Sequence, residues 1–166
     1  KIKNSERGAA RNFGASKSSG NYLNFFDSDD LSYDNHIHEA ENIIKLNKNI
    51  KLFHLSYIFF DQKKNIKKQI INKGNTNRKI LRGNFISLNS VFIRSDIFNA
   101  FKFDENRDLS GSEDWDLWLR ISKKYNFISY KKITSEIINH ENRSMNLNDL
   151  AKTKKRLKIL RNKLGN

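Results

Sequence analysis

The sequence predicts an α/β domain in which a mixed, mostly parallel sheet is flanked by helices. Three short apolar runs, residues 21–26, 51–60 and 87–93, have the length and composition of strands. Between the first two, residues 33–47 have apolar residues that recur every three or four positions, as on one face of a helix. This alternation is typical of α/β proteins, and 166 residues fit one domain.

The first half of the chain is expected to hold two helices and two strands. Asn4 or Ser5 is a favoured N-cap for a first helix, which ends by Gly20. The elements that follow are a strand, a helix and a strongly aromatic strand, at residues 21–26, 33–47 and 51–60. Residues 61–82 are polar and Lys-rich without clear periodicity, so we expect a loop with some helix there.

The second half continues the alternation. Ser110 and Glu113 have the spacing of a capping box and predict a helix that runs to about Lys124. The other expected elements are strands at 87–93, 127–130 and 133–139, helices at 94–101 and 148–164, and a loop at 103–111. We divide the chain into a domain at residues 1–146 and a basic C-terminal helix at residues 147–166.

The composition narrows the class of partner. The formal net charge is +14, which favours nucleic acid, acidic lipid or phosphorylated small molecules. The chain is also rich in Lys, Asn and Ile and has no proline, so a biased coding composition is an alternative source of the charge. The absence of cysteine excludes disulfides and thiolate metal sites. No apolar run approaches the ~20 residues of a membrane span.

Three carboxylates follow the first predicted strand, at Asp27, Asp29 and Asp30. Ligands of open α/β sheets bind at the carboxyl ends of strands, and clustered carboxylates repel one another. A divalent cation such as Mg²⁺ or Mn²⁺ would balance them, because it takes oxygen ligands and bridges to phosphates. The simpler interpretation is that these residues cap the next helix, and for this stretch alone it is preferred.

Several motifs taken in order resemble the family 2 glycosyltransferases of the GT-A fold. They are GAARNFG, FFDSDD, LNSVFIRSDIF, FDENRD and SEDWDLWLR, followed by a His and a Ser. The resemblance covers nearly the whole chain, from Asn4 to Ser144, and favours the metal interpretation of the acidic cluster. The family's N-terminal portion, whose first strand and loop hold the nucleotide base, has no counterpart. We therefore expect a partial domain that lacks the first βαβ segment.

The resemblance implies a donor site around the acidic cluster. The donor would be a nucleotide-diphospho-sugar bound through Mn²⁺ or Mg²⁺. Asp29 would be the main metal ligand, Asp27 would lie nearer the ribose, and His140 would complete the metal site. Arg11 and Asn12 match the ARN triplet that lines the nucleotide pocket. Ser28, between the aspartates, belongs to the same set of nucleotide-sugar contacts.

The resemblance also implies the chemistry at Asp114. This residue, with Glu113 beside it, would be the general base that takes the proton from the acceptor hydroxyl as the oxygen attacks C1 of the sugar and inverts the anomer. The alternative is structural, because both acids lie in the first turn of a helix, where its dipole favours anions. If the catalytic interpretation is right, Asp29, Asp114 and His140 converge on one cleft.

The other histidines and one charged pair are expected to be structural. His36 and His38 diverge on a helix and are expected on the surface, whereas His54 lies within a strand and belongs to the core or an edge. Asp116 and Arg120 have the i, i+4 spacing of a helical ion pair.

The expected function is metal-dependent, inverting sugar transfer to a glycan or lipid-linked hydroxyl acceptor, in surface polysaccharide or glycoconjugate synthesis. The basic amphipathic C-terminal helix suits peripheral contact with an anionic membrane, although a solvated face is the somewhat preferred interpretation. We expect a cytoplasmic protein, located at the inner face of the membrane if that contact is made. Nucleic acid is not expected, but a basic nucleic-acid-binding module is the alternative function, and an inactive glycosyltransferase fragment is a third.

Overall fold

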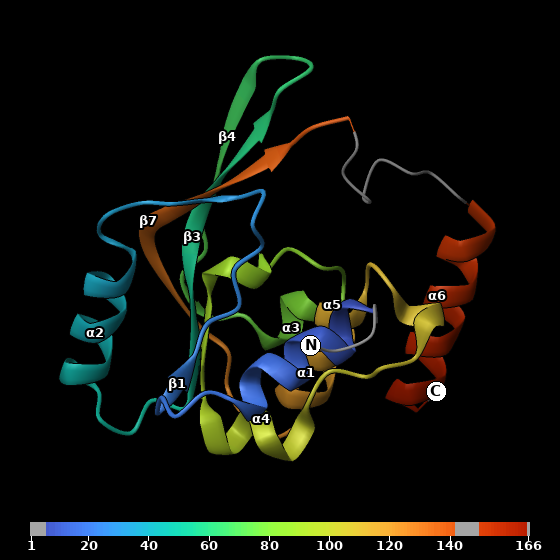
Figure 1. Cartoon of the computed structure of the whole chain (residues 1–166), viewed down its shortest axis with the longest axis horizontal. Helices are drawn as coiled ribbons and strands as arrows, with labels where there is room; N and C mark the ends of the chain where they lie inside the picture. The colour runs from blue at the N-terminus through green and yellow to red at the C-terminus, as the bar shows by residue number, and fades with distance from the viewer. Residues whose placement is uncertain (1–5, 142–149, 166) are drawn as a thin grey trace.

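The computed structural model describes residues 6–141 and 150–165, which form a mixed sheet with helices on both faces (Figure 1). The strand order is β1-β6-β3-β7-β2, with β4 paired to β3 and β5 paired to β7. The strands are β1 (Tyr22–Leu23), β2 (Leu31–Ser32), β3 (Leu52–Asp61), β4 (Ile66–Ile70), β5 (Gly74–Asn75), β6 (Val91–Arg94) and β7 (Ile128–Asn139). The helices are α1 (Arg7–Ser16), α2 (His36–Leu46), α3 (Asn77–Ile80), α4 (Ser95–Phe101), α5 (Glu113–Ser122) and α6 (Leu150–Leu164), with 3₁₀ turns η1 (Leu88–Ser90) and η2 (Arg107–Leu109).

Strands β3 and β7 form the centre of the sheet and run parallel to each other. The predicted aromatic strand at 51–60 is confirmed as β3. The two predicted strands at 127–130 and 133–139 are one strand, because Leu55 pairs with Tyr130 and the next residue, Ser56, pairs with Ile133. The register shift lets β7 absorb two exposed lysines that break its apolar pattern and suggest a turn.

The predicted α/β class is confirmed, but the expected predominance of parallel pairing is not found in the described sheet. Apart from β3 with β7, its strand pairs are antiparallel. Alternation of helices and strands predicts the class without setting strand direction, which depends on whether each connection is a hairpin or a crossover. Strand β4 pairs with β3 as a hairpin. A loop was predicted there because the sequence of β4, IKKQI, is polar and shows no alternation.

The first predicted strand is also shorter than expected. Only Tyr22 and Leu23 pair with β6, at an end of the strand order, and their side chains pack against the two cores on opposite faces of the sheet. Beyond them the amide of Asn24 donates to the carbonyls of Asn89 and Val91, both at 2.9 Å. Side-chain bonds therefore replace the backbone ladder as the chain leaves the sheet toward Asp27.

Alternating residues of the central strands build a core on each face of the sheet. Phe53 and Phe92 pack with Ala40 and other residues of α2 on one face. Leu52 and the neighbouring strand residues on the other face pack with α4 and α5, including the fully buried Trp118. Figure 1 shows α2 alone on its side of the sheet and α1, α3, α4, α5 and α6 on the other. The position of the first turn of α5 is therefore fixed by the packing of the rest of that helix in the core.

Helix α1 is fastened to the loop that follows α4. Its predicted caps Asn4 and Ser5 lie outside the described residues, and it ends at Ser16 rather than at Gly20. The side chain of Asn12 donates to the carbonyl of Phe103 at 3.0 Å and accepts from the Phe103 N–H at 2.9 Å. Gly8 is buried, and a Cβ there would lie 2.7 Å from the carbonyl oxygen of Asp104.

We expect Gly8→Ala to lower the free energy of unfolding by about 1–3 kcal/mol, because the added methyl group forces α1 away from the backbone carbonyl of Asp104. Gly14→Ala is the matched control, since it lies in the same helix and a Cβ there meets no atom within 4 Å. That variant should gain about 0.5–1 kcal/mol from helix propensity. Denaturant unfolding of both variants measures the difference, and equal effects would contradict the close approach at Gly8.

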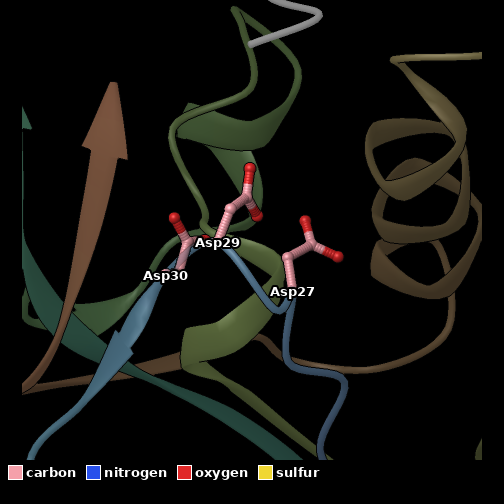
Figure 2. A group of neighbouring side chains, drawn as sticks. All are labelled: Asp27, Asp29 and Asp30. Atoms are coloured by element: carbon pink, nitrogen blue, oxygen red, sulfur yellow. The ribbon is translucent and has the colours of Figure 1, made fainter. Parts of the chain in front are cut away.

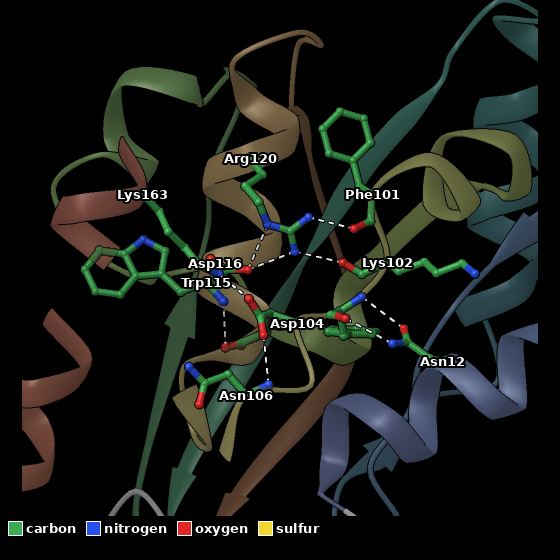
Figure 3. Close-up of polar contacts among 11 residues, drawn as sticks. Asn12, Phe101, Lys102, Asp104, Asn106, Trp115, Asp116, Arg120 and Lys163 are labelled. Atoms are coloured by element: carbon green, nitrogen blue, oxygen red, sulfur yellow. Dashed lines mark hydrogen bonds and ion pairs between the residues drawn. The ribbon is translucent and has the colours of Figure 1, made fainter. Parts of the chain in front are cut away.

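Helix α6 is anchored on α5 and on the loop before it (Figure 3). The Lys163 ammonium pairs with Asp104 and, at 2.8 Å, with Asp116, which is buried and also pairs with Arg120 at 2.8 Å as predicted. Leu160 is buried against the core. Within the described ranges, no helix combines the length and apolar character needed to cross a membrane.

Candidate functional site

The acidic turn after β1 and the start of α5 open into one cavity of about 620 Å³. Asp27 and Asp30 line it from the turn, and Glu113 and Asp114 line it from α5. Residues that are distant in sequence therefore share one space, on the side of the sheet that carries α1 and α5.

Arg11 of α1 joins the two acidic groups. Its guanidinium donates to Asp27 Oδ1 at 2.8 Å and to Glu113 Oε1 at 2.7 Å, and its side chain is 13% exposed. Burial alone would lower the pKa of Arg11, but the charges of Asp27 and Glu113 and their hydrogen bonds outweigh burial and raise it. The cation is thus held permanently between two carboxylates that would otherwise repel each other.

Glu113 is committed to Arg11 rather than to a capping box. The N-cap of α5 is Ser112, not Ser110, and the side chain of Ser112 makes no capping bond. Glu113 Oε2 accepts from the N–H of Gly111 at 2.6 Å while Oε1 faces Arg11. The predicted capping box was therefore wrong, because a nearly buried guanidinium competes for the same carboxylate more strongly than an orphan N–H.

Asp114 is a partly buried carboxylate of the cavity whose pKa is shifted toward neutral pH. Its Oδ2 accepts from the amide of Asn84 at 3.0 Å, and Oδ1 accepts from the N–H of Trp115 at 2.7 Å. Burial, and next the charge of Glu113, raise the pKa of Asp114 to about 6, against the lowering effect of both hydrogen bonds and of Arg11. A carboxylate in this state accepts a proton readily at neutral pH.

The three aspartates of the acidic turn each place a carboxylate oxygen within 4.8 Å of the others (Figure 2). Asp30 accepts from the N–H of Ile138 at 3.1 Å and from the amide of Asn89 at 3.3 Å. Asp29 is more exposed, and its Oδ2 lies 3.2 Å from Nε2 of His140 at the end of β7. Three carboxylates with an adjacent imidazole are a donor set that suits a hard divalent cation.

The capping interpretation of the acidic turn is not supported. Helix α2 begins at His36 with Asn35 at its N-cap, well beyond Asp30. Strand β2, which was not predicted, separates the turn from the helix. Asp30 is instead held by Asn89 of η1 and Ile138 of β7, Asp29 lies against His140, and Asp27 is paired with Arg11.

Two expected nucleotide contacts are not brought to the cavity. Asn12 lies on the side of α1 that faces Phe103, and its amide also donates to Glu105 at 2.9 Å, so its hydrogen-bonding groups are used in holding the loop. Ser28 is exposed in the turn and does not line the cavity. Asp29 and His140 do not line the cavity that Asp114 lines, so the expected convergence of these three residues on one cleft is not found; His140 lines a smaller cavity of about 280 Å³ with Asp61 and Lys63.

The remaining histidines divide between prediction and correction. His54 is fully buried in β3, as expected, and burial lowers its pKa to about 4. His36 was expected on the surface but is 2% exposed, and its ring nitrogens lie 2.9 Å from Thr134 Oγ1 and 3.2 Å from Asn24 Oδ1. Residues i and i+2 of a helix point in different directions, so His38 is exposed on α2 while His36 is buried.

Sequence reasoning missed several residues of the cavity. Asn84 and Tyr57 line it beside Asp114, and burial raises the pKa of Tyr57 to about 12. Neither residue belongs to a motif. The only signal in the sequence is a polar group within an apolar strand, for Tyr57, or shortly before one, for Asn84. Five cationic residues that line the cavity were also missed: Arg7, Arg107, Lys152, Lys155 and Arg156.

Comparisons with known proteins agree on one family. Residues 2–162 match the model of the family described as glycosyltransferase like family 2. An uncharacterized glycosyltransferase of Rickettsia bellii (strain RML369-C) is 33% identical over 125 residues, which are 74% of this chain and 18% of that protein. The crystal structure of S. aureus TarS 1-349 in complex with UDP superposes with a TM-score of 0.62 at 15% identity. That match covers 93% of this chain and 50% of the TarS chain, so the chain spans half or less of both relatives.

Proposed function

This chain belongs to the glycosyltransferase-like family 2, and we propose that it carries the metal-binding and base-carrying part of an inverting sugar transferase. The donor is a nucleotide-diphospho-sugar and the acceptor is a hydroxyl group. The observation that carries the proposal is the shared cavity, in which the acidic turn and Asp114 meet across Arg11. Surface polysaccharide or glycoconjugate synthesis is the proposed setting.

In this proposal the acidic turn holds the diphosphate of the donor. Asp29, with oxygens of Asp27 and Asp30 and the imidazole of His140, would hold a Mn²⁺ or Mg²⁺ ion. Such a cation would supply charge stabilisation for the leaving diphosphate. Arg11 keeps the Asp27 carboxylate in place by the 2.8 Å ion pair. The UDP named for TarS supports uridine diphosphate as the nucleotide part of the donor.

Asp114 acts as the general base in the proposal. It lies in the same cavity as the acidic turn, and Asn84 and the backbone of Trp115 each donate to one of its oxygens. Ionised Asp114 takes the proton of the acceptor hydroxyl as the oxygen attacks C1 of the donor sugar from the side opposite the departing diphosphate. Glu113 does not take part in proton transfer but holds Arg11 and the loop at Gly111.

Binding of UDP with and without Mn²⁺ tests the donor site. Titration calorimetry should show tighter binding of UDP when Mn²⁺ is present, and Asp29→Asn should reduce that affinity by about tenfold or more, a loss of about 1.4 kcal/mol. Asp96→Asn is the matched control, because it removes a surface carboxylate that pairs with Arg94 away from the cavity. UDP binding that is indifferent to Mn²⁺ and to Asp29→Asn would contradict the metal site.

A further inference from the structure

One wall of the cavity is cationic. This wall consists of Arg7 at the start of α1, Arg107 of η2, and Lys152, Lys155 and Arg156 of α6. Asp108 is the one carboxylate that lines the cavity from the same elements, and it pairs with Lys155 at 2.8 Å. The other lining carboxylates lie on the acidic turn and at the start of α5, so they come from different elements than the cationic wall.

The wall is held in place by the docking of α6. Lys163 pairs with Asp116 and Asp104, and Leu160 is buried against α5 and its neighbours (Figure 3). Near the N-terminal end of the helix, Lys155 reaches Asp108 of η2. Three attachments along one helix therefore fix which of its side chains line the cavity.

Arg156 lies against the loop that leads to Asp114, the proposed general base. An added Cβ on Gly111 would be 3.4 Å from a nitrogen of the Arg156 guanidinium, and Gly111 has a φ of 84°, which favours glycine. Gly111 precedes Asp114 by three residues, and its N–H donates to Glu113. Arg156, Gly111 and Asp114 line the same cavity, so a ligand that fills it meets both the guanidinium and the carboxylate.

We propose that the acceptor carries a phosphate group next to the hydroxyl that attacks the donor. The proposal rests on the function proposed above, in which the donor diphosphate binds at the acidic turn. A phosphate near the cationic wall places negative charge opposite positive charge, while the hydroxyl faces Asp114. The planar guanidinium fork of arginine suits phosphate oxygens, and Arg107 and Arg156 are the specificity-determining residues.

The phosphate can belong to a phosphorylated soluble glycan or to the headgroup of a lipid-linked acceptor. Both sources present the same anionic chemistry to the wall. The competing destination for the same cations is the diphosphate of the donor. The experiment therefore measures UDP and the acceptor-like probe on the same samples.

The test titrates glycerol 3-phosphate into protein saturated with UDP and Mn²⁺, with glycerol as the neutral probe, and follows binding by NMR. The double variant Arg107→Gln/Arg156→Gln removes two charges of the wall. The control Lys158→Gln/Arg161→Gln removes two exposed charges of α6 that do not line the cavity. Phosphatidylcholine vesicles with and without phosphatidylglycerol form a second arm, and thermal unfolding confirms that both variants are folded.

We expect glycerol 3-phosphate, but not glycerol, to bind, and the wall variant to lose about tenfold in affinity while the control loses less than about twofold. UDP affinity should be unchanged in both variants. Wall-dependent binding of phosphatidylglycerol vesicles as well would assign the phosphate to a lipid headgroup, and binding of glycerol 3-phosphate alone would assign it to a soluble acceptor.

Three results would overturn the proposal: a fall in UDP affinity in the wall variant, equal losses in wall and control variants, or no wall-dependent binding of either probe. The first would assign the cations to the donor. Failure of the proposed function is a separate result, because it appears as absent UDP binding in the unsubstituted protein while the glycerol 3-phosphate titration, repeated without UDP, still reports on the wall.

Discussion

Asp114→Asn should lower the turnover of sugar transfer by about 10²–10⁴-fold, the range attributed to a positioned general base. Asparagine has nearly the same shape and keeps an oxygen that accepts from the N–H of Trp115, but it cannot accept a proton. The Michaelis constant for the donor should change little, because the donor site proposed above lies at the acidic turn. Steady-state kinetics with a nucleotide-sugar donor measure both quantities.

The pH profile supplies the control for this variant. Since the pKa of Asp114 is raised to about 6, turnover of the unsubstituted protein should fall as the pH drops below 6, and the residual turnover of Asp114→Asn should lack this limb. Asn84→Ala removes a hydrogen bond that lowers the pKa of Asp114, so it should move the limb to higher pH. An Asp114→Asn variant with near-normal turnover would end the assignment.

The same ionisation has an opposite effect on stability. The pKa of Asp114 is raised by folding from its ordinary value to about 6, so the folded protein binds this proton more tightly than the unfolded chain. Its contribution to stability is therefore complete below about pH 4 and is lost as the pH rises through 6. As the pH rises from 4 to above 6, the free energy of unfolding of the unsubstituted protein should therefore fall by up to about 2 kcal/mol relative to that of the Asn variant. Solvent screening of the half-buried group makes the difference smaller.

The second large effect is expected from Arg11→Met. Removal of one partner from a buried ion pair leaves uncompensated charge, and here two carboxylates, Asp27 and Glu113, lose the same cation. We expect a loss of about 3 kcal/mol in the free energy of unfolding, toward the lower end of the usual range because Asp27 is partly exposed. Because the charge of Arg11 also lowers the pKa of Asp114, the acid limb of turnover should move to higher pH.

Arg94→Met is the matched control for this prediction. Arg94 pairs with Asp96 through two hydrogen bonds of 2.7 and 2.6 Å, but the pair lies on the surface. Exposed pairs contribute little, so denaturant unfolding should barely change. Equal stability losses for the two variants would show that the burial of Arg11 is not what makes its bridge important.

The parts of the fold predicted best are those with strong local patterns. The aromatic run became β3, and the stretch DWDLWLR became α5, with Trp118 and Leu119 buried as its periodicity indicates. The proximity of the acidic turn and Asp114 was predicted from the order of motifs rather than from local physics. It could be foreseen because each motif follows or begins an element at the same end of the sheet.

The parts predicted poorly depend on contacts between distant segments. Strand β4 exists because it pairs with β3, and its own residues show no strand pattern. Asn12 turns to Phe103, and His36 turns inward to Thr134, because partners far along the chain lie within reach. No local periodicity encodes such partners, so the motif predicted a nucleotide contact for Asn12, whereas its side chain is hydrogen-bonded to Phe103 and Glu105.

The parallel pairing of β3 with β7 has a consequence for how the protein folds. It joins Phe53 to Ile128, and the bridge from Arg11 to Glu113 joins residues that are still further apart in the sequence. Contacts of such high sequence separation form late, because the intervening chain must lose its freedom before they contribute. During refolding the helical circular dichroism signal should therefore recover before the ability to bind UDP. The site is a product of the completed chain topology, not of any segment that folds alone.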